Sequence, residues 1–119
     1  FHCHSGPFFS THRFHNNGLP LTEDFGLSEI SGYETDRGKF VTPSLRNVEL
    51  TAPYMHDGRF ETLEAVVEHY ASGIERSETL DPNLSKHPGR GIPLSTEDKS
   101  ALVAFLKTLT DEQFVVSNP

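Results

Sequence analysis

The stretch Phe40-Val-Thr-Pro-Ser-Leu-Arg-Asn-Val-Glu-Leu-Thr-Ala-Pro-Tyr-Met-His-Asp-Gly-Arg-Phe-Glu-Thr-Leu-Glu-Ala-Val-Val-Glu-His-Tyr70 decides the fold of this chain. Thr42 is a residue type that caps helices and Pro43 one that suits their first turn, so a short helix is predicted at 43–49. From residue 62 onward, apolar residues recur on one helical face, which predicts an amphipathic helix over 62–72. The residues of that face are Leu63, Val66, Val67 and Tyr70.

The loop between these two predicted helices carries side chains that can bind a metal. Ala52-Pro53 favours extended backbone, and Asp57-Gly58 favours a turn. Met55 and His56 lie between the two signals, on a loop expected to point toward the region that Tyr70 faces. This part of the chain is therefore predicted to wrap around something other than protein.

The composition is that of one small acidic domain with a modest apolar content. The chain has 119 residues, of which 34% are apolar, a net charge of −7 and a mean hydropathy of −0.46. This length predicts one domain, and the low apolar fraction suggests that a cofactor or further chain completes its core. The acidic balance argues against nucleic acid and anionic membranes as partners. No run of about 18 apolar residues predicts a membrane span, and no signal peptide is visible.

The single cysteine lies at the start of the sequence and is followed directly by a histidine. One cysteine excludes an internal disulfide. Cys3-His4 matches the second half of Cys-x-x-Cys-His, the attachment signal of c-type haem, whose first cysteine would fall immediately before Phe1. In that signal the thiols form thioethers to the haem and the histidine binds the iron. The alternative interpretation is a free buried cysteine beside a surface histidine.

Two long segments are predicted to be irregular loops. Residues 10–39 are rich in Gly, Asn, Ser, Thr and charge, and a loop of this length favours a functional role or packing over a ligand. His12 and His15 lie in it, so two histidines and Cys3 could form part of a zinc site, although a second cysteine or a His-x3-His pair is missing. Residues 74–94 form the second loop, which three prolines interrupt.

A second amphipathic helix is predicted at 95–109. Ser95 to Asp98 has the pattern of a capping box, in which the first and fourth residues satisfy each other's backbone N–H groups. The apolar residues that follow at helical spacing define the face expected to be buried. They are Ala101, Leu102, Phe105, Leu106 and Leu109.

Taken together, six segments give the chain a family resemblance. They are Cys3-His-Ser-Gly-Pro7, Phe14-His-Asn-Asn-Gly-Leu19, Thr42-Pro-Ser-Leu-Arg-Asn-Val48, Leu50-Thr-Ala-Pro-Tyr-Met-His-Asp-Gly58, Thr62-Leu-Glu-Ala-Val-Val67 and Thr96-Glu-Asp-Lys-Ser-Ala-Leu-Val-Ala-Phe-Leu-Lys-Thr-Leu109. With them the chain resembles, over essentially its whole length, the C-terminal haem domain of the bacterial di-haem cytochrome c peroxidase and MauG family. The third and fourth segments are the most specific part of this resemblance.

The resemblance implies an all-α, cytochrome c-like domain with long irregular loops. Its helices are expected near 43–49, 62–72 and 95–109, and short strand pairing between residues 14 and 41 would be compatible with it. Residues 1–119 would be the C-terminal domain of a larger two-haem protein, without the helix that precedes the haem motif in the family. Phe105 and Leu106 would then be short of partners, so the isolated chain is expected to be only marginally stable and either to dimerise or to keep the rest of its protein bound.

The resemblance also implies a set of ligands. Cys3 would form a thioether to haem c, and His4 would be the proximal ligand of its iron. The distal ligand of the family falls on Tyr70, a position that is Met in the peroxidases and Tyr in MauG-like members. A calcium ion, held partly by backbone carbonyls, would fall on Thr51 and Pro53.

Residue chemistry leaves the distal ligand open between two side chains. Met is the commoner partner of His in cytochromes c, so Met55 is the alternative. Tyr70 is favoured because it shares a helix face with the predicted buried residues, whereas the turn after Met55 could direct it several ways. Arg46 and Arg59 are candidates to pair with the haem propionates, or are solvated charges. His56 is expected to hydrogen-bond near the propionates or a domain interface.

The function implied by the resemblance is that of a redox domain that relays or stores oxidising equivalents for peroxide chemistry at a second haem. The expected partners are an N-terminal haem domain of the same protein, hydrogen peroxide at that haem, and a small redox protein or protein substrate as electron donor. The expected location is the periplasm. No catalytic residue is assigned within this chain, which alone is expected to be inactive. The alternatives are a stand-alone electron-transfer or docking module and a His-rich metal-binding fragment without haem.

Overall fold

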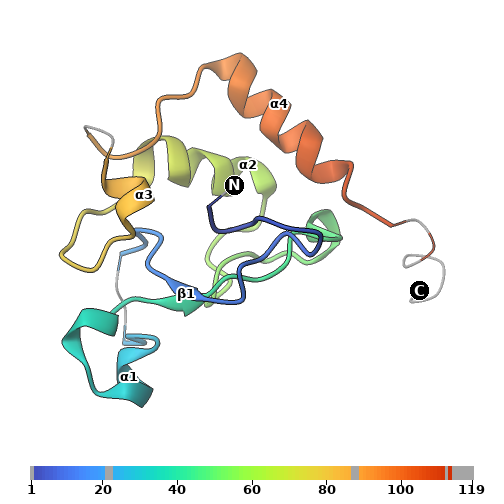
Figure 1. Ribbon diagram of the computed structural model, residues 1–119. Coiled ribbons are helices and arrows are strands. Elements are labelled where there is room, and N and C mark those ends of the chain that lie inside the picture. The colour runs from blue at the N-terminus through green and yellow to red at the C-terminus, as the bar shows by residue number, and fades with distance from the viewer. Residues whose placement is uncertain (1, 21–22, 87–88, 112, 114–119) are drawn as a thin grey trace.

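The computed structural model describes residues 2–20, 23–86, 89–111 and 113. Figure 1 shows α4 lying beside α2 at one end of the molecule and α1 at the opposite end, with β1 between them. The elements found in the described residues are β1 (Phe14–His15), α1 (Ser28–Ser31), the 3₁₀-helix η1 (Glu34–Asp36), β2 (Phe40–Val41), the 3₁₀-helix η2 (Val48–Leu50), α2 (Leu63–Glu68), the π-helix η3 (His69–Gly73), α3 (Pro82–Ser85) and α4 (Thr96–Lys107).

The prediction of an all-α fold is wrong. β1 and β2 pair in antiparallel fashion, with Phe14 opposite Val41 and His15 opposite Phe40. The helices are short, and α4 with its 12 residues is the longest in the described part of the chain. The pairing closes the long loop of residues 14–41 at its base, because its two ends satisfy each other's backbone groups there.

The helix predicted at 43–49 is also wrong. The backbone N–H of Thr42 donates to the carbonyl of Arg13 at 2.9 Å, and the carbonyl of Thr42 accepts from the Ser10 hydroxyl at 2.6 Å. Thr42 therefore continues the strand pairing instead of capping a helix. Asn47 adopts a left-handed conformation with φ of 59°, which delays the helical turn to η2.

The other two predicted helices are confirmed in position. The Thr62 side chain accepts from the backbone N–H of Ala65 at 3.1 Å and caps α2, whose winding continues through η3 to Gly73. Ser95 and Asp98 form the predicted capping box at the start of α4. Local sequence signals place both helices because each carries its own cap.

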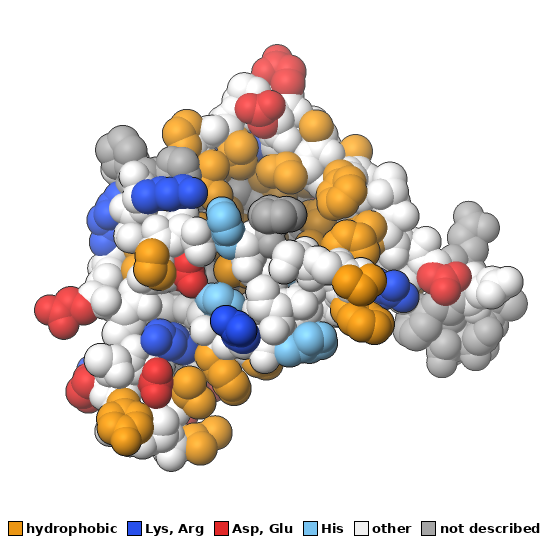
Figure 2. All heavy atoms as spheres, in the orientation of Figure 1, with side chains coloured by type: hydrophobic (Ala, Val, Ile, Leu, Met, Phe, Trp, Pro, Cys, Tyr) orange, Lys and Arg blue, Asp and Glu red, His pale blue; other side chains and the backbone are white. Residues whose placement is uncertain are grey.

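The apolar core lies between α2 and α4. Leu63, Val67 and Val103 form its buried cluster, and Val48, Tyr54, Leu94 and Leu106 pack against it. The predicted buried face of α4 was wrong in part, because Leu102 and Phe105 are 40% and 50% exposed. Figure 2 shows hydrophobic side chains gathered over this end of the molecule.

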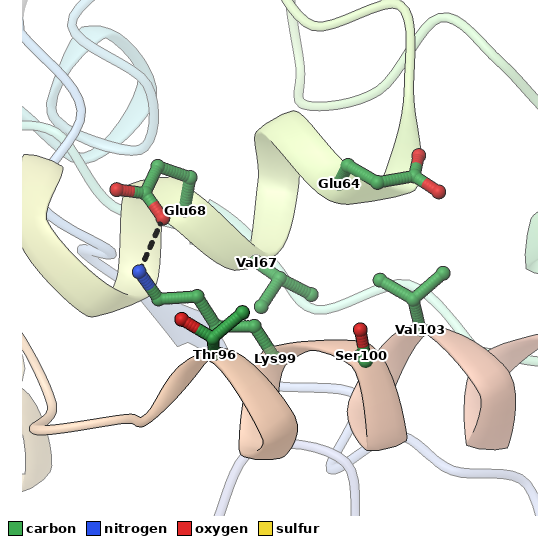
Figure 3. Close-up of a pocket in the computed structure, with 7 residues that line it drawn as sticks. All are labelled: Glu64, Val67, Glu68, Thr96, Lys99, Ser100 and Val103. Atoms are coloured by element: carbon green, nitrogen blue, oxygen red, sulfur yellow. Dashed lines mark ion pairs between the residues drawn. The ribbon is translucent and has the colours of Figure 1, made fainter.

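A shallow groove of about 270 Å³ runs along the same pair of helices. Figure 3 shows Val67 and Val103 facing each other across it, beside an ion pair in which Lys99 Nζ lies 2.8 Å from Glu68 Oε2. None of the residues that line the groove belongs to the metal-capable group predicted from the sequence. Among the described residues, no helix is long and apolar enough to cross a membrane.

Candidate functional site

The loop at the start of the chain holds His4 in a defined orientation. His4 Nδ1 lies 3.0 Å from the carbonyl oxygen of Phe9, and since a carbonyl only accepts, Nδ1 carries the proton in this bond. Burial lowers the pKa of His4, and this effect outweighs the hydrogen bond to Phe9. The ring is therefore neutral at neutral pH, with its lone pair on Nε2, which is the form of histidine that binds metals.

Cys3 is a half-buried free thiol next to a second histidine and a carboxylate. Burial raises its pKa, and the nearby Asp81 raises it further. Cys3, His15 and Asp81 each offer a ligand atom, and these atoms all lie within 4.8 Å of one another. His15 Nδ1 is 2.7 Å from Asp81 Oδ2, and its Nε2 is 3.2 Å from the Thr11 hydroxyl. This group of thiol, imidazole and carboxylate has the donor types that zinc prefers.

Asn17 joins the two side chains predicted as alternative distal ligands. Its Nδ2 donates to the Tyr70 hydroxyl at 3.1 Å and lies 3.4 Å from Met55 Sδ. Burial raises the pKa of Tyr70, the hydrogen bond from Asn17 opposes this rise, and the nearby Cys3 adds to it. The structure thus brings Cys3, Met55 and Tyr70 into one region through residues of the loop before Gly18.

The backbone on either side of Asn17 is fixed by hydrogen bonds. The buried His69 approaches the Asn17 carbonyl with Nε2 at 2.8 Å, so Nε2 carries the proton. Gly18 has φ of 77°, its N–H donates to Asn16 Oδ1 at 2.9 Å, and its carbonyl accepts from Glu75 at 2.7 Å. Asn16-Asn17-Gly18 therefore forms an Asx turn, in which the Asn16 side chain accepts from the backbone two residues on, and the Gly18 carbonyl attaches this turn to the chain just after η3.

The backbone around Tyr70 is also held by hydrogen bonds to residues that come later in the sequence. Its carbonyl accepts from Ile92 at 2.8 Å, and the Ile74 N–H donates to the carbonyl of Arg90 at 2.9 Å. Between these bonds lies Gly91, whose position leaves no room for a side chain, because a Cβ there would clash with the backbone of Ala71. The loop that contains Gly91 thus closes over the carbonyl groups of η3.

The predicted propionate partners lie in other contacts. Arg46 is exposed, donates to the Pro7 carbonyl at 2.9 Å and stacks over the Phe8 ring at 5.6 Å. Arg59 pairs with Asp57 through Nη2 and Oδ2 at 2.7 Å. Arg59 also donates through Nη1 to the Pro20 carbonyl at 3.1 Å, so both arginines join loops that are distant in the sequence.

His56 and the predicted calcium ligands lie on the 51–58 loop. The His56 ring stacks on the Phe40 ring at 3.7 Å between centroids, and its Nε2 lies 4.0 Å from Asp57 Oδ2. Thr51 and Pro53 are exposed, and the Ala52–Pro53 peptide bond is cis. Met55 has φ of 74°, which is a strained conformation for a residue with a side chain.

Three residues of the site region were not singled out by the sequence. Asn17 was named only within the segment Phe14-His-Asn-Asn-Gly-Leu19, because a short polar residue before glycine gives no signal beyond that of a turn. His69 lies next to the apolar face of its helix without being part of the pattern, and Asp81 gave no signal beyond preceding a proline. The pair Asp81-Pro82 could have indicated the start of a helix. Asp81 does cap α3, because its side chain accepts from the Asn83 N–H at 2.9 Å.

Comparisons with known proteins relate this arrangement to bacterial haem enzymes. The chain is 34% identical to the cytochrome-c peroxidase IdrP2 of Pseudomonas sp. (strain SCT), over 98% of this chain and 37% of that protein. It is 35% identical to the methylamine utilization protein MauG of Methylorubrum extorquens, over 98% of this chain and 32% of that protein. A crystal structure of a MauG-like protein associated with microbial copper homeostasis matches with a TM-score of 0.73 and 39% identity, covering 92% of this chain and 42% of that one.

These likenesses confirm the resemblance to the cytochrome c peroxidase and MauG family: over nearly its whole length, the chain is a homologue of part of these proteins. It spans about a third of the length of the curated relatives. No family model matches the chain.

Proposed function

We propose that this chain is a c-type haem redox domain of a di-haem peroxidase or MauG-like oxidase. The observation that carries this proposal is the neutral His4 imidazole, oriented by the Phe9 carbonyl and directly following the Cys3 thiol. The relatives named peroxidase and MauG support it. The domain would relay or store oxidising equivalents for peroxide-dependent chemistry at a second haem outside this chain.

The chemistry of the donors fits haem c. Cys3 would bind it through a thioether, and His4 would bind the iron through Nε2. The hydrogen bond from His4 Nδ1 to Phe9 fixes the plane of the ring and raises the basicity of Nε2. The bound haem supplies a one-electron couple whose potential depends on the axial ligands.

Tyr70 is the proposed distal ligand, and Met55 is the alternative. A phenolate stabilises the ferric state, whereas a thioether raises the potential. Asn17 lies against both side chains, which keeps both within reach of one site. Tyr70→Phe should convert the ferric spectrum from six-coordinate toward five-coordinate high-spin, while Met55→Leu should leave it nearly unchanged. A sulfur-to-iron charge-transfer band that Met55→Leu abolishes would instead assign Met55.

The remaining assignments rest on the resemblance. Arg46 and Arg59 would bind the haem propionates once they exchange their present partners, the Pro7 carbonyl and Asp57. His56 would hydrogen-bond near the propionates or a domain interface. Thr51 and Pro53 would offer backbone carbonyls to a calcium ion.

The partners proposed for the whole protein follow from the same assignment. They are an N-terminal haem domain, hydrogen peroxide at its haem, and a small redox protein or protein substrate, all in the periplasm. No catalytic residue is assigned within this chain, which alone would not reduce peroxide. Because Leu102 and Phe105 are largely exposed, a homodimer of the isolated chain is proposed, and sedimentation at several concentrations tests it.

The test of the haem proposal is to produce the chain with a c-type haem maturation system and to record its absorption and intact mass. A Soret band, with sharp α and β bands on reduction and a mass increased by one haem that persists in denaturant, is expected. Cys3→Ser should abolish the covalent attachment, whereas His12→Ala, at an exposed histidine, should not. A wild-type chain without haem would reject the proposal.

A second candidate function is metal binding without haem, and the group of Cys3, His15 and Asp81 is the observation that favours it. This group and haem attachment exclude each other, because both use the Cys3 sulfur. Equimolar zinc in the purified chain, without a Soret band and lost in His15→Ala, would support this function.

A further inference from the structure

Asn17 contacts both possible distal ligands through the same nitrogen. Its Nδ2 carries two protons and lies 3.1 Å from the Tyr70 hydroxyl and 3.4 Å from Met55 Sδ. The two acceptors are unequal, because a thioether sulfur is a weak acceptor and an oxygen that loses its proton becomes a strong one. The hydrogen bond to Tyr70 therefore gains strength when that side chain becomes a phenolate.

The backbone that carries the Asn17 side chain is held by hydrogen bonds that involve neither Tyr70 Oη nor Met55 Sδ. The Asn17 carbonyl binds His69 at 2.8 Å, and the carbonyl of the next residue, Gly18, binds the N–H of Glu75 at 2.7 Å. These bonds connect the turn at residues 16–18 to His69, the first residue of η3, and to Glu75, which follows η3. Asn17 thus presents its side chain from a fixed backbone. Binding of Tyr70 to the iron therefore does not carry the entropy cost of ordering that backbone.

Met55 starts from a less favourable backbone than Tyr70. Its φ of 74° is uncommon for a residue with a side chain, whereas Tyr70 lies within the helical backbone of η3 and does not have a positive φ. The carbonyl of Tyr70 is also held by Ile92. The two candidate ligands therefore differ in backbone conformation and backbone hydrogen bonding as well as in the chemistry of the donor atom. Both differences favour Tyr70.

We propose that Asn17 is a positioning residue that selects Tyr70 over Met55 as the distal ligand of the haem iron. This inference rests on the proposed haem function. Asn17 donates to the Tyr70 oxygen in its anionic form and keeps Met55 Sδ in a weak contact beside it. An oxygen donor in place of sulfur favours the ferric state, so Asn17 also lowers the reduction potential of the domain through Tyr70.

The test compares the haem-loaded ferric wild type with Asn17→Asp, Asn17→Ala and Asn17→Gln. Asp has the size of Asn but replaces the donor with an anionic acceptor, so it should repel the phenolate. The ratio of Tyr70-ligated to other ferric forms, measured by phenolate-to-iron charge-transfer absorption and resonance Raman scattering, should fall about tenfold or more. Gln keeps the amide and should restore part of the signal. The midpoint potential should rise in Asn17→Ala, which weakens ligation by Tyr70 without adding a charge near the iron.

Asn83→Ala is the matched control, because Asn83 is also a half-buried amide but donates to Asp81 Oδ1 at 3.0 Å, in α3. It should leave the ratio and the potential unchanged. The His69 bond uses the backbone of Asn17, so all substitutions retain it. Circular dichroism identifies any variant that does not fold, and the other two then carry the comparison.

Each outcome of this experiment is decisive. Adding Met55→Leu to Asn17→Asp should convert the remaining six-coordinate form to five-coordinate, since Met55 is then the replacement ligand. A spectrum and potential of Asn17→Asp equal to those of a Tyr70-ligated wild type would overturn the role of Asn17 and leave the haem function intact. A Met55-ligated wild type would overturn it as well. A wild type that binds no haem would overturn both.

Discussion

The α2–α4 pair and the loop region around Asn17 differ in how far polar contacts stabilise them. The helices meet through an apolar cluster of Leu63, Val67 and Val103, and the turn at residues 16–18 is held by backbone and side-chain hydrogen bonds. In the loop region, buried polar residues such as Asn16, His69 and Asp81 lie among the buried apolar residues Leu19, Ile74 and Leu80. The comparison shows that the helical pair supplies a frame, whereas polar contacts determine where the site side chains lie.

The two regions also differ in how completely they are covered. On α4, Leu102 and Phe105 remain largely exposed beside the buried Val103. In the loop region, His15 and Asp81 satisfy each other at 2.7 Å. The helices therefore leave apolar side chains exposed, whereas the loops pair most of their buried polar groups, with Arg37 Nε as an exception. Substitutions in the two regions should differ in the size of their effect on stability.

The largest effect is expected in the apolar cluster. Leu63→Ala removes most of a 5%-exposed side chain between α2 and α4 and should lower the free energy of unfolding by about 2–5 kcal/mol. Ile30→Ala, at an 87%-exposed side chain of α1, is the control and should change it by less than about 0.5 kcal/mol. Urea unfolding measures both. Equal losses in the two variants would mean that the helices are packed differently.

An intermediate effect is expected in the loop region. Asp81→Ala removes the partner of His15 and the cap of α3 at once, and should lower the free energy of unfolding by about 1–3 kcal/mol. Hydrogen exchange should show the loss first in the backbone N–H groups of Leu84 and Ser85, which donate to the Asp81 carbonyl. Glu61→Ala, at an exposed carboxylate, is the control and should change neither the free energy of unfolding nor the hydrogen exchange in α3. An effect confined to α4 would contradict the prediction.

The smallest effect is expected from acid acting on the pair of Asp57 and Arg59. The hydrogen bond from Arg59 lowers the pKa of Asp57 below its ordinary value of 3.8. A carboxyl group with a lower pKa in the folded state stabilises the fold above its ordinary pKa, and loses this contribution as the pH falls through the folded-state value. The Arg59 and Asp57 side chains keep 20% and 30% of their surface exposed, so solvent screens the pair and its contribution should stay below about 1 kcal/mol.

The measurement is the difference in unfolding free energy between the wild type and Asp57→Asn as a function of pH. This difference should be constant near neutral pH and should shrink as the solution becomes more acidic than the ordinary pKa of a carboxyl group. A difference that grows on acidification would show that Arg59 does not stabilise the charged form of Asp57.

The sequence predicted the helical frame better than the site. Thr62 and Ser95 mark the starts of α2 and α4 because caps and apolar spacing act within one turn of the chain. The helix expected at 43–49 failed for a nonlocal reason: Thr42 pairs with Arg13, a residue far away in the sequence. The strand pairing that made the all-α prediction wrong has the same nonlocal origin.

The residues of the site also divide into those that a sequence pattern indicates and those whose role depends on distant contacts. Cys3, His4 and Tyr70 could be singled out because their chemical types match a known pattern of haem ligands. Asn17 could not, since its role depends on contacts with Met55 and Tyr70, which lie 38 and 53 residues away. An asparagine before a glycine predicts a turn equally well with or without such contacts.

The π-helix η3 makes the length of its segment as important as its side chains. A π-helix has more residues per turn than an α-helix, so His69 and Tyr70 can reach the carbonyl and the amide of the same residue, Asn17. Deleting one residue such as Ala71 would let the segment wind as an ordinary α-helix and would change the angle between the His69 and Tyr70 side chains. In homologous chains, a one-residue gap at this point would therefore alter the site more than many substitutions would.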